Sequence, residues 1–109
     1  MNIEIKKLHA DAILPTRATD GSAGYDLYTA RDEIIPRRKL AMVGTGVAVY
    51  IKDPGIVGLL IVRSGLAVKD SLVMPNAVGV IDSDYQGEII VPLLDVKESS
   101  GACIKDMVI

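Results

Sequence analysis

Residues 47–62 read VAVYIKDPGIVGLLIV, and this stretch decides the fold class. Its first part places Val47, Val49 and Ile51 at every second position, which is the period of a strand with one buried and one wetter face. An Asp-Pro-Gly turn signal follows. The remaining run, residues 56–62, is apolar on both faces. Such a strand suits the interior of two packed sheets or a subunit interface.

The rest of the chain repeats this pattern of β-rich runs and turn residues. The runs recur at intervals of about ten residues, which is typical of a sandwich or a barrel. The expected strands cover residues 3–7, 24–28, 33–35, 40–43, 47–51, 56–61, 72–75, 78–81, 88–94 and 104–109. One short helix is expected over residues 64–69. The sequence therefore predicts an all-β fold with at most one short helix.

Composition and charge narrow the class of protein. A chain of 109 residues, half of them apolar, is long enough for one compact domain, expected to span residues 1–109. The 12 basic and 14 acidic residues give a net charge of −2, without the basic excess that nucleic-acid binding usually needs. No apolar run approaches the roughly 20 residues needed to cross a bilayer. We therefore expect no nucleic-acid or membrane partner.

The cysteine content and the N-terminus indicate the compartment. Cys103 is the only cysteine, so an intrachain disulfide is excluded, and its expected role is that of a small buried hydrophobic residue. A single cysteine fits a reducing compartment. Residues 1–7 alternate polar and apolar side chains and lack the apolar core of a signal peptide. We expect a soluble, cytoplasmic protein.

The densest polar segment lies at residues 76–91, NAVGVIDSDYQGEIIV. Its layout of strand, acidic turn and strand predicts a β-hairpin. Asp82, Asp84 and Gly87 also match the first, third and sixth positions of a calcium-binding loop. That alternative fails because Gln86 and Leu93 stand at the fifth and twelfth positions, and no flanking helices are expected.

Two further segments carry charged residues next to apolar strands. Arg63-Ser64-Gly65 follows an apolar run and opens the expected helix, where a forked guanidinium, a hydroxyl and backbone N–H groups can converge on a phosphate. A plain surface turn is the alternative. Asp26 stands in the apolar run at residues 23–27 and needs a partner if it is buried. Arg63 or a metal-bound water would serve, and a solvent-facing carboxylate is the alternative.

Taken together and in this order, the three segments resemble the signature motifs of the trimeric dUTPases. Residues 23–27 (AGYDL) resemble motif one, residues 63–67 (RSGLA) motif two and residues 79–88 (GVIDSDYQGE) motif three. Similarity at residues 15–19 and 44–47 extends the likeness over nearly the whole chain. The resemblance implies a jelly-roll-like β-barrel or sandwich, a homotrimer, and sites at subunit boundaries to which different chains contribute motifs.

The resemblance also implies an activity, the hydrolysis of dUTP to dUMP and pyrophosphate. Asp82 takes the place of the general base that orients a water against the α-phosphorus, while Mg²⁺ bridges the triphosphate oxygens. Tyr85 takes the place of the aromatic side chain that packs under deoxyribose and leaves no room for a 2′-hydroxyl. Uracil contacts are implied for Asn76, Gly79, Val80, Ile81 and, across from Ile81 on the returning strand, Ile90.

The phosphate and metal contacts follow from the same resemblance. Arg63, Ser64 and Gly65 take the places of the phosphate contacts. Asp26 takes the place of the acidic residue of motif one, which lies near the metal through water or braces the arginine.

The resemblance weakens near the end of the chain. Motif four should read about Gly-x-Arg-Ile-Ala-Gln, whereas residues 101–106 read GACIKD. Cys103 replaces the arginine, and Asp106 replaces the glutamine that touches nucleotide and phosphate, where an acid should repel the triphosphate. The glycine-rich motif five, whose aromatic residue closes over uracil, is expected to be missing, which should weaken binding.

Two other readings stay open at this point. One is a non-catalytic or weakened nucleotide-binding trimer with the same fold. The other is a relative of the dCTP deaminases, which share the fold, although the Asp-x-Asp-Tyr-x-Gly-Glu run is closer to the diphosphatases.

Overall fold

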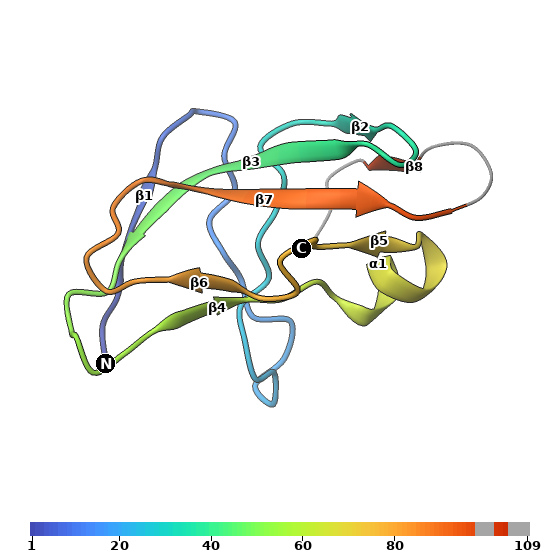
Figure 1. Ribbon diagram of the computed structural model, residues 1–109. Helices are drawn as coiled ribbons and strands as arrows, with labels where there is room; N and C mark the ends of the chain where they lie inside the picture. Colours follow the sequence, from blue (N-terminus) through green and yellow to red (C-terminus); the bar gives the residue numbers. More distant parts are fainter. Residues whose placement is uncertain (98–101, 105–109) are drawn as a thin grey trace.

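The computed structural model describes residues 1–97 and 102–104, and it is built almost entirely of β-strands (Figure 1). The strands are β1 (Glu4–Lys7), β2 (Glu33–Ile35), β3 (Leu40–Tyr50), β4 (Gly58–Leu60), β5 (Leu72–Val73), β6 (Gly79–Ile81), β7 (Glu88–Asp95) and β8 (Ala102–Ile104). Within the described residues the one helix is α1 (Ser64–Lys69). The prediction of an all-β fold with one short helix is confirmed.

The strands form one four-stranded sheet and two strand pairs. The larger sheet has the order β1-β3-β7-β5, and β2 pairs with β8 and β4 with β6. All of these pairings are antiparallel. In Figure 1, β3 and β7 run side by side across the molecule, and the β4–β6 pair is drawn below them. The longest ladder, β3 with β7, is therefore the frame on which the other elements are arranged.

The alternation along β7 shows how the core is made. Ile89, Val91 and Leu93 are buried, while the residues between them are more exposed. Because side chains of a strand point to opposite faces in turn, one face of β7 enters the core and the other does not. Burying one such aliphatic side chain contributes roughly 1.5–3 kcal/mol. The buried cluster comprises Ala12, Leu27, Ile35, Val43, Val47, Leu60, Leu72, Met74, Ile89, Val91 and Leu93.

The central strand β3 contains a bulge where the sequence predicts a break. Residues 40–43 and 47–51 are predicted as two strands, but β3 runs continuously from Leu40 to Tyr50, and its register with β7 shifts between Gly44 and Ala48. Gly46 has a φ of 69°. The two-strand prediction was wrong because the Gly-Thr-Gly signal, typical of a turn, here marks a bulge within one strand.

The predicted strand at residues 24–28 is largely absent. Asp26 forms only an isolated antiparallel bridge with Thr16, in which each backbone N–H donates to the other residue's carbonyl. Just after Thr16, the chain curls into a turn in which the Arg17 guanidinium donates to the Ser22 carbonyl and the Thr19 N–H to the Ser22 hydroxyl. Because the chain turns here, the segment after Thr16 is not extended, and a longer ladder with the predicted strand cannot form.

The predicted hairpin across residues 82–87 is also wrong in its pairing. β6 pairs with β4, whereas β7 pairs with β3 and β5, so the two segments enter different sheets. Ile81 therefore lies opposite Gly58, and Ile90 lies opposite Gly44 rather than opposite Ile81. The Lys52 N–H donates to the Ser83 carbonyl at 3.0 Å, and this bond ties the connection to the end of β3. The acidic turn is thus a crossing between sheets.

The other elements differ from the predictions mainly in length. Helix α1 occupies the predicted residues 64–69, and β2 the predicted residues 33–35. β4, β5 and β6 are shorter than predicted because each pairs over only two or three residues. The predicted strand at residues 104–109 coincides with β8 at Ile104, and its remainder lies outside the described residues. None of the helical residues described forms a segment long and apolar enough to cross a membrane.

Gly46 is the position in the bulge where a side chain should be least tolerated. Its φ is 69°, and a Cβ at this residue would lie 2.8 Å from the Cβ of Ala12 in the core. Strain and overpacking together should make Gly46→Ala lower the free energy of unfolding by about 2 kcal/mol or more. Denaturant unfolding at fixed protein concentration measures this. Gly21→Ala is the control, because the nearest atom to its Cβ would be 4.0 Å away; equal losses in both variants would contradict the prediction.

Candidate functional site

A cavity of about 210 Å³ lies between β6, the connection after it and β7. It gathers the predicted base-reading residues, the predicted sugar selector and the predicted catalytic base. The lining residues are Leu60, Met74, Asn76, Gly79, Val80, Ile81, Asp82, Tyr85, Glu88, Ile89, Ile90 and Pro92. Although Ile81 and Ile90 are not cross-strand partners, both face this cavity. The structure therefore brings together the residues that the sequence assigns to nucleoside recognition.

The position of β6 depends on its close contact with β4 and on the turn that precedes it. At Gly79 an added Cβ would lie 3.1 Å from the Cβ of Leu60, so a glycine lets β6 approach β4 closely. Before β6, the Ala77 N–H donates to the Met74 carbonyl at 2.9 Å, and Ala77 has a φ of 61°. This tight turn leaves Asn76 exposed at the rim of the cavity.

β6 also has an edge that no described strand covers. In the part of the chain that the structure describes, its one ladder partner is β4. The N–H and C=O groups along the other edge of a strand stay available for another partner. Because β6 lines the cavity, its backbone is suited to reading the hydrogen-bonding pattern of a flat polar ligand.

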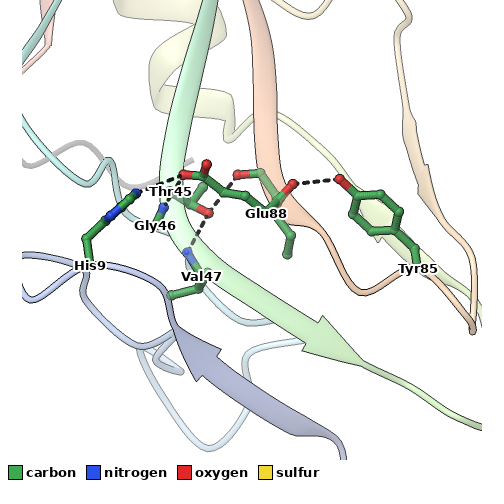
Figure 2. A network of polar contacts seen from close by, with 7 residues as sticks. His9, Thr45, Gly46, Val47, Tyr85 and Glu88 are labelled. Carbon is green, nitrogen blue, oxygen red and sulfur yellow. Dashed lines mark hydrogen bonds and ion pairs between the residues drawn. The ribbon is translucent and has the colours of Figure 1, made fainter.

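Asp82 and Tyr85 occupy the connection that leaves β6. Asp82 is exposed, and its carbonyl accepts the Tyr85 N–H at 3.1 Å. The Tyr85 hydroxyl donates to the carbonyl of Glu88 at 2.8 Å (Figure 2). A Cβ at Gly87 would lie 2.6 Å from the Tyr85 hydroxyl oxygen. The tyrosine ring therefore lies against a glycine that has no side chain to push it away.

A second anchor joins this connection to the N-terminal strand. The Lys52 N–H that holds Ser83 comes from a residue with a φ of 69°. The Lys52 ammonium donates to the carboxylate of Glu4, and this hydrogen bond raises the pKa of Lys52. Both side chains are largely exposed, so the ion pair adds little stability. The sequence analysis did not find this contact.

Asp26 and Arg63 meet at a different cavity. The Arg63 Nη1 lies 3.6 Å from the Asp26 Oδ2, with the aspartate side chain 21% and the arginine side chain 50% exposed. Of the two partners predicted for Asp26, the structure shows Arg63 in contact with it. Both residues line a second cavity of about 880 Å³, which Tyr25 also lines.

The predicted phosphate contacts are therefore divided from the predicted base. Arg63 does not line the cavity that holds Asp82, and Ser64 and Gly65 are exposed at the start of α1 and line neither cavity. Asp106, predicted to touch the nucleotide, lies outside the described residues. Cys103 lies on β8. Within one chain, the structure joins the predicted nucleoside contacts and leaves the predicted phosphate contacts elsewhere.

The sequence analysis missed Glu88. Its carboxylate accepts the Gly46 N–H at 2.8 Å, and its side chain is 25% exposed at the edge of the cavity. The His9 side chain is half exposed, and its Nε2 lies 4.0 Å from the same carboxylate (Figure 2). The one signal in the sequence was a charged residue at the head of an otherwise apolar strand. That signal alone is also typical of a solvated strand end.

Comparison with known proteins identifies the class to which this fold and cavity belong. The family model described as dUTPase matches residues 10–102. The chain therefore belongs to the dUTPase family.

The similar proteins agree with this assignment. The chain is 52% identical over 82 residues to a deoxyuridine 5′-triphosphate nucleotidohydrolase of Psychrobacter cryohalolentis, which covers 73% of this chain and 53% of that protein. It is 44% identical over 98 residues to the protein of the same name from Buchnera aphidicola, which covers 84% and 64%. The chain thus spans about half the length of the first of these curated relatives and somewhat more of the second.

Solved structures show the same fold. A mutant dUTPase from phage phi11 of S. aureus, described with a structural Mg(II) ion, superposes with a TM-score of 0.80 at 33% identity, covering 87% of this chain and 60% of that one. A dUTPase of Staphylococcus bacteriophage 80alpha, solved with dUpNHpp, gives a TM-score of 0.77 at 27% identity, covering 95% and 71%. The predicted dUTPase fold is confirmed.

The Asp26–Arg63 contact should contribute little to stability on its own. Arg63 is half exposed, and exposed ion pairs typically contribute about 0–1 kcal/mol. We expect Asp26→Asn to lower the free energy of unfolding by less than about 1 kcal/mol. Asp95→Asn is the matched comparison, because Asp95 is fully buried and its carboxylate accepts the Lys97 N–H. Denaturant titration should show the larger loss for Asp95; the reverse order would contradict this account.

Proposed function

We propose that this chain hydrolyses dUTP to dUMP and pyrophosphate, as a homotrimer, with Asp82 as the general base. The observation that carries this proposal is the cavity in which the β6 edge, Tyr85 and Asp82 meet. Its volume of about 210 Å³ is below the roughly 300–1,000 Å³ of sites that enclose a whole drug-sized ligand. A cavity of this size suits the base and sugar of a nucleotide, with the phosphates extending outwards past Asp82.

Base selection would come from the backbone of β6. The free edge between Gly79 and Ile81 offers donors and acceptors in a fixed pattern. Uracil matches such a pattern in a way that cytosine, with its exocyclic amine, does not, and a mismatched base leaves a buried polar group unpaired. Ile90 lines the same cavity and provides an apolar wall against the 5-methyl group of thymine.

Sugar selection would come from Tyr85. Tyr85 is 44% exposed, and its ring is held by the hydroxyl bond to the Glu88 carbonyl and by contact with Gly87. A ring fixed in this way presents a flat wall to the sugar. Deoxyribose packs against such a wall, whereas a 2′-hydroxyl would collide with it.

Asp82 is suited to proton transfer because its carboxylate is exposed at the rim of the cavity. A carboxylate there accepts a proton from the water that attacks the α-phosphorus. Asn76 lies at the same rim and would help to hold the nucleoside. The geometry separates the two tasks, with recognition inside the cavity and chemistry at its mouth.

The carboxylates present fit Mg²⁺ that arrives with the nucleotide. The described residues contain no group of three or more His, Cys, Asp or Glu side chains arranged to hold a metal. Mg²⁺ is usually held by one or two carboxylates together with waters and substrate phosphates, and Asp26, through water, would be such a donor. When bound, Mg²⁺ would neutralise phosphate charge that otherwise repels Asp82.

A trimer would explain why the predicted phosphate contacts lie away from Asp82 within one chain. Arg63, Ser64 and Gly65 would reach the triphosphate from a neighbouring subunit. The Arg63 face carries exposed apolar side chains, with Leu59 60% and Ile61 58% exposed. Such surface is typical of a protein contact. We also propose a cytoplasmic location, which the low cysteine content supports.

The direct test is a nucleotide panel with the full chain. Pyrophosphate release is measured with dUTP, dTTP, dCTP and UTP, with Mg²⁺ and with EDTA. We expect dUTP to be hydrolysed in preference to the other three, and EDTA to abolish turnover. Ammonia release from dCTP would instead identify a deaminase. Tight dUTP binding without pyrophosphate release would identify a non-catalytic nucleotide-binding protein.

Asp82→Asn tests the role of the base. The amide keeps the shape of the side chain but cannot accept the proton, so kcat for dUTP should fall by about 100-fold or more. dUTP binding, followed by calorimetry, should persist. Asp11→Asn is the control, because Asp11 is exposed and lines neither cavity. Full turnover in Asp82→Asn would remove Asp82 from this role.

A further inference from the structure

The β3 bulge and the start of β7 are joined by side chains in place of ladder bonds. Gly44 pairs with Ile90 and Ala48 with Glu88, so residues 45–47 of β3 all lie opposite the single residue Ile89. Such an excess leaves backbone groups without their ladder partners. Buried backbone groups need other partners, and here two side chains provide them.

The first of these side chains is Thr45. It is fully buried, and its hydroxyl donates to the Ile89 carbonyl at 2.7 Å while accepting the Val47 N–H at 3.3 Å. The second is Glu88, whose Oε1 accepts the Gly46 N–H at 2.8 Å. A hydrogen bond to a charged group is stronger than one between neutral groups. Together the two side chains fix the bulge to the first residues of β7 (Figure 2).

The space around the Glu88 carboxylate is closely matched to it. A Cβ at Gly44 would lie 2.8 Å from Oε1, so only glycine leaves room for the carboxylate. His9 approaches the same oxygen from the segment after β1. The side chain of Glu88 is therefore held on several sides rather than projecting freely from the strand.

The same residue also holds Tyr85, but through its backbone. The Glu88 carbonyl accepts the Tyr85 hydroxyl, and Gly87 between them provides the surface on which the ring lies. The position of the ring thus depends on where the residue 88 carbonyl stands. The Glu88 backbone pairs with Ala48, and the Glu88 carboxylate binds the neighbouring Gly46 N–H, so both contacts hold this residue against the bulge.

We propose that Glu88 is a positioning residue that sets the discrimination between deoxyribonucleotide and ribonucleotide by fixing Tyr85. This inference rests on the proposed function, in which Tyr85 faces the sugar. Glu88 acts by accepting one N–H, so its charge is less important than its acceptor oxygen. Glutamine, which keeps an acceptor at the same reach, should replace it, whereas alanine should not.

The experiment compares kcat/KM for dUTP and for UTP in the full chain. We expect Glu88→Ala to lower the ratio of the two by about tenfold or more, and Glu88→Gln to keep it within about threefold of the wild-type value. Tyr85→Phe, which retains the ring and removes its bond to the Glu88 carbonyl, should lower the ratio as Glu88→Ala does. If Glu88 acts through that bond, the double variant Glu88→Ala/Tyr85→Phe should have a ratio no lower than that of either single variant.

Gly87→Ala provides an independent displacement of the ring. Its Cβ would lie 2.6 Å from the Tyr85 hydroxyl oxygen, so the ratio should again fall. Gly21→Ala, whose Cβ would have its nearest neighbour 4.0 Å away, should leave the ratio unchanged. If Glu88→Ala fails to fold, Tyr85→Phe and Gly87→Ala still decide, since unchanged ratios in both overturn the proposal.

The outcomes separate this inference from the proposed function. A wild-type chain that prefers dUTP, with variants that keep the same preference, would overturn the role of Glu88 and leave the function intact. A wild-type chain that neither hydrolyses dUTP nor binds dUMP more tightly than UMP would overturn the function itself. Calorimetric affinities for dUMP and UMP give the same comparison without turnover. In either assay, reduced discrimination in Glu88→Ala supports the proposal.

Discussion

The hydrogen bonds across the break in the β3–β7 ladder are the constraint on which the rest of the structure depends. At this point three residues of β3 lie opposite one residue of β7. Backbone groups in the middle of the main sheet would therefore lack partners without the side chains of Thr45 and Glu88. Gly46 makes the arrangement possible by taking a φ of 69°. Glu88, Ile89 and Ile90, which lie opposite the bulge, also line the smaller cavity, so the irregular part of the sheet and this wall of the cavity involve the same residues.

The second constraint is that one edge of β6 has no ladder partner among residues 1–97 and 102–104. The sequence predicts a hairpin in which β7 would pair with β6, and such a ladder would have used the backbone groups of β6 that face the cavity. In the structure β7 pairs with β3 and β5 instead. The connection after β6 therefore spans two sheets, and its own bonds, from Lys52 and from Tyr85, hold it in place. The error in the predicted pairing thus concerns the property that makes the site possible.

The predictions were most accurate where structure is local. The helix at residues 64–69 and the strand at residues 33–35 follow from patterns within a few residues, and the structure has them at the same positions. The residues predicted to contact the nucleoside were grouped because three motifs in one order resemble one family, and the structure places them around one cavity, while their roles stay predictions. Partners far apart in sequence left no such trace. The contact from Gly46 to Glu88 spans 42 residues, and no periodicity marks it. A Gly-Thr-Gly segment predicts a turn and a bulge equally well.

The placement of the two cavities bears on the proposed need for a neighbouring subunit. Leu60, Ile81 and Ile89 line both cavities, so the cavities lie on two sides of the same group of side chains. Asp26 and Arg63 open onto one side, and Asp82 and Tyr85 onto the other. Under the proposed function, a nucleotide in the smaller cavity would meet its base and sugar contacts in one subunit, while Arg63 of that subunit lines the larger cavity. Association of subunits over the exposed Leu59 and Ile61 would bury apolar surface and supply the missing phosphate contacts in one step. Under the proposed function, assembly and completion of the site are the same event.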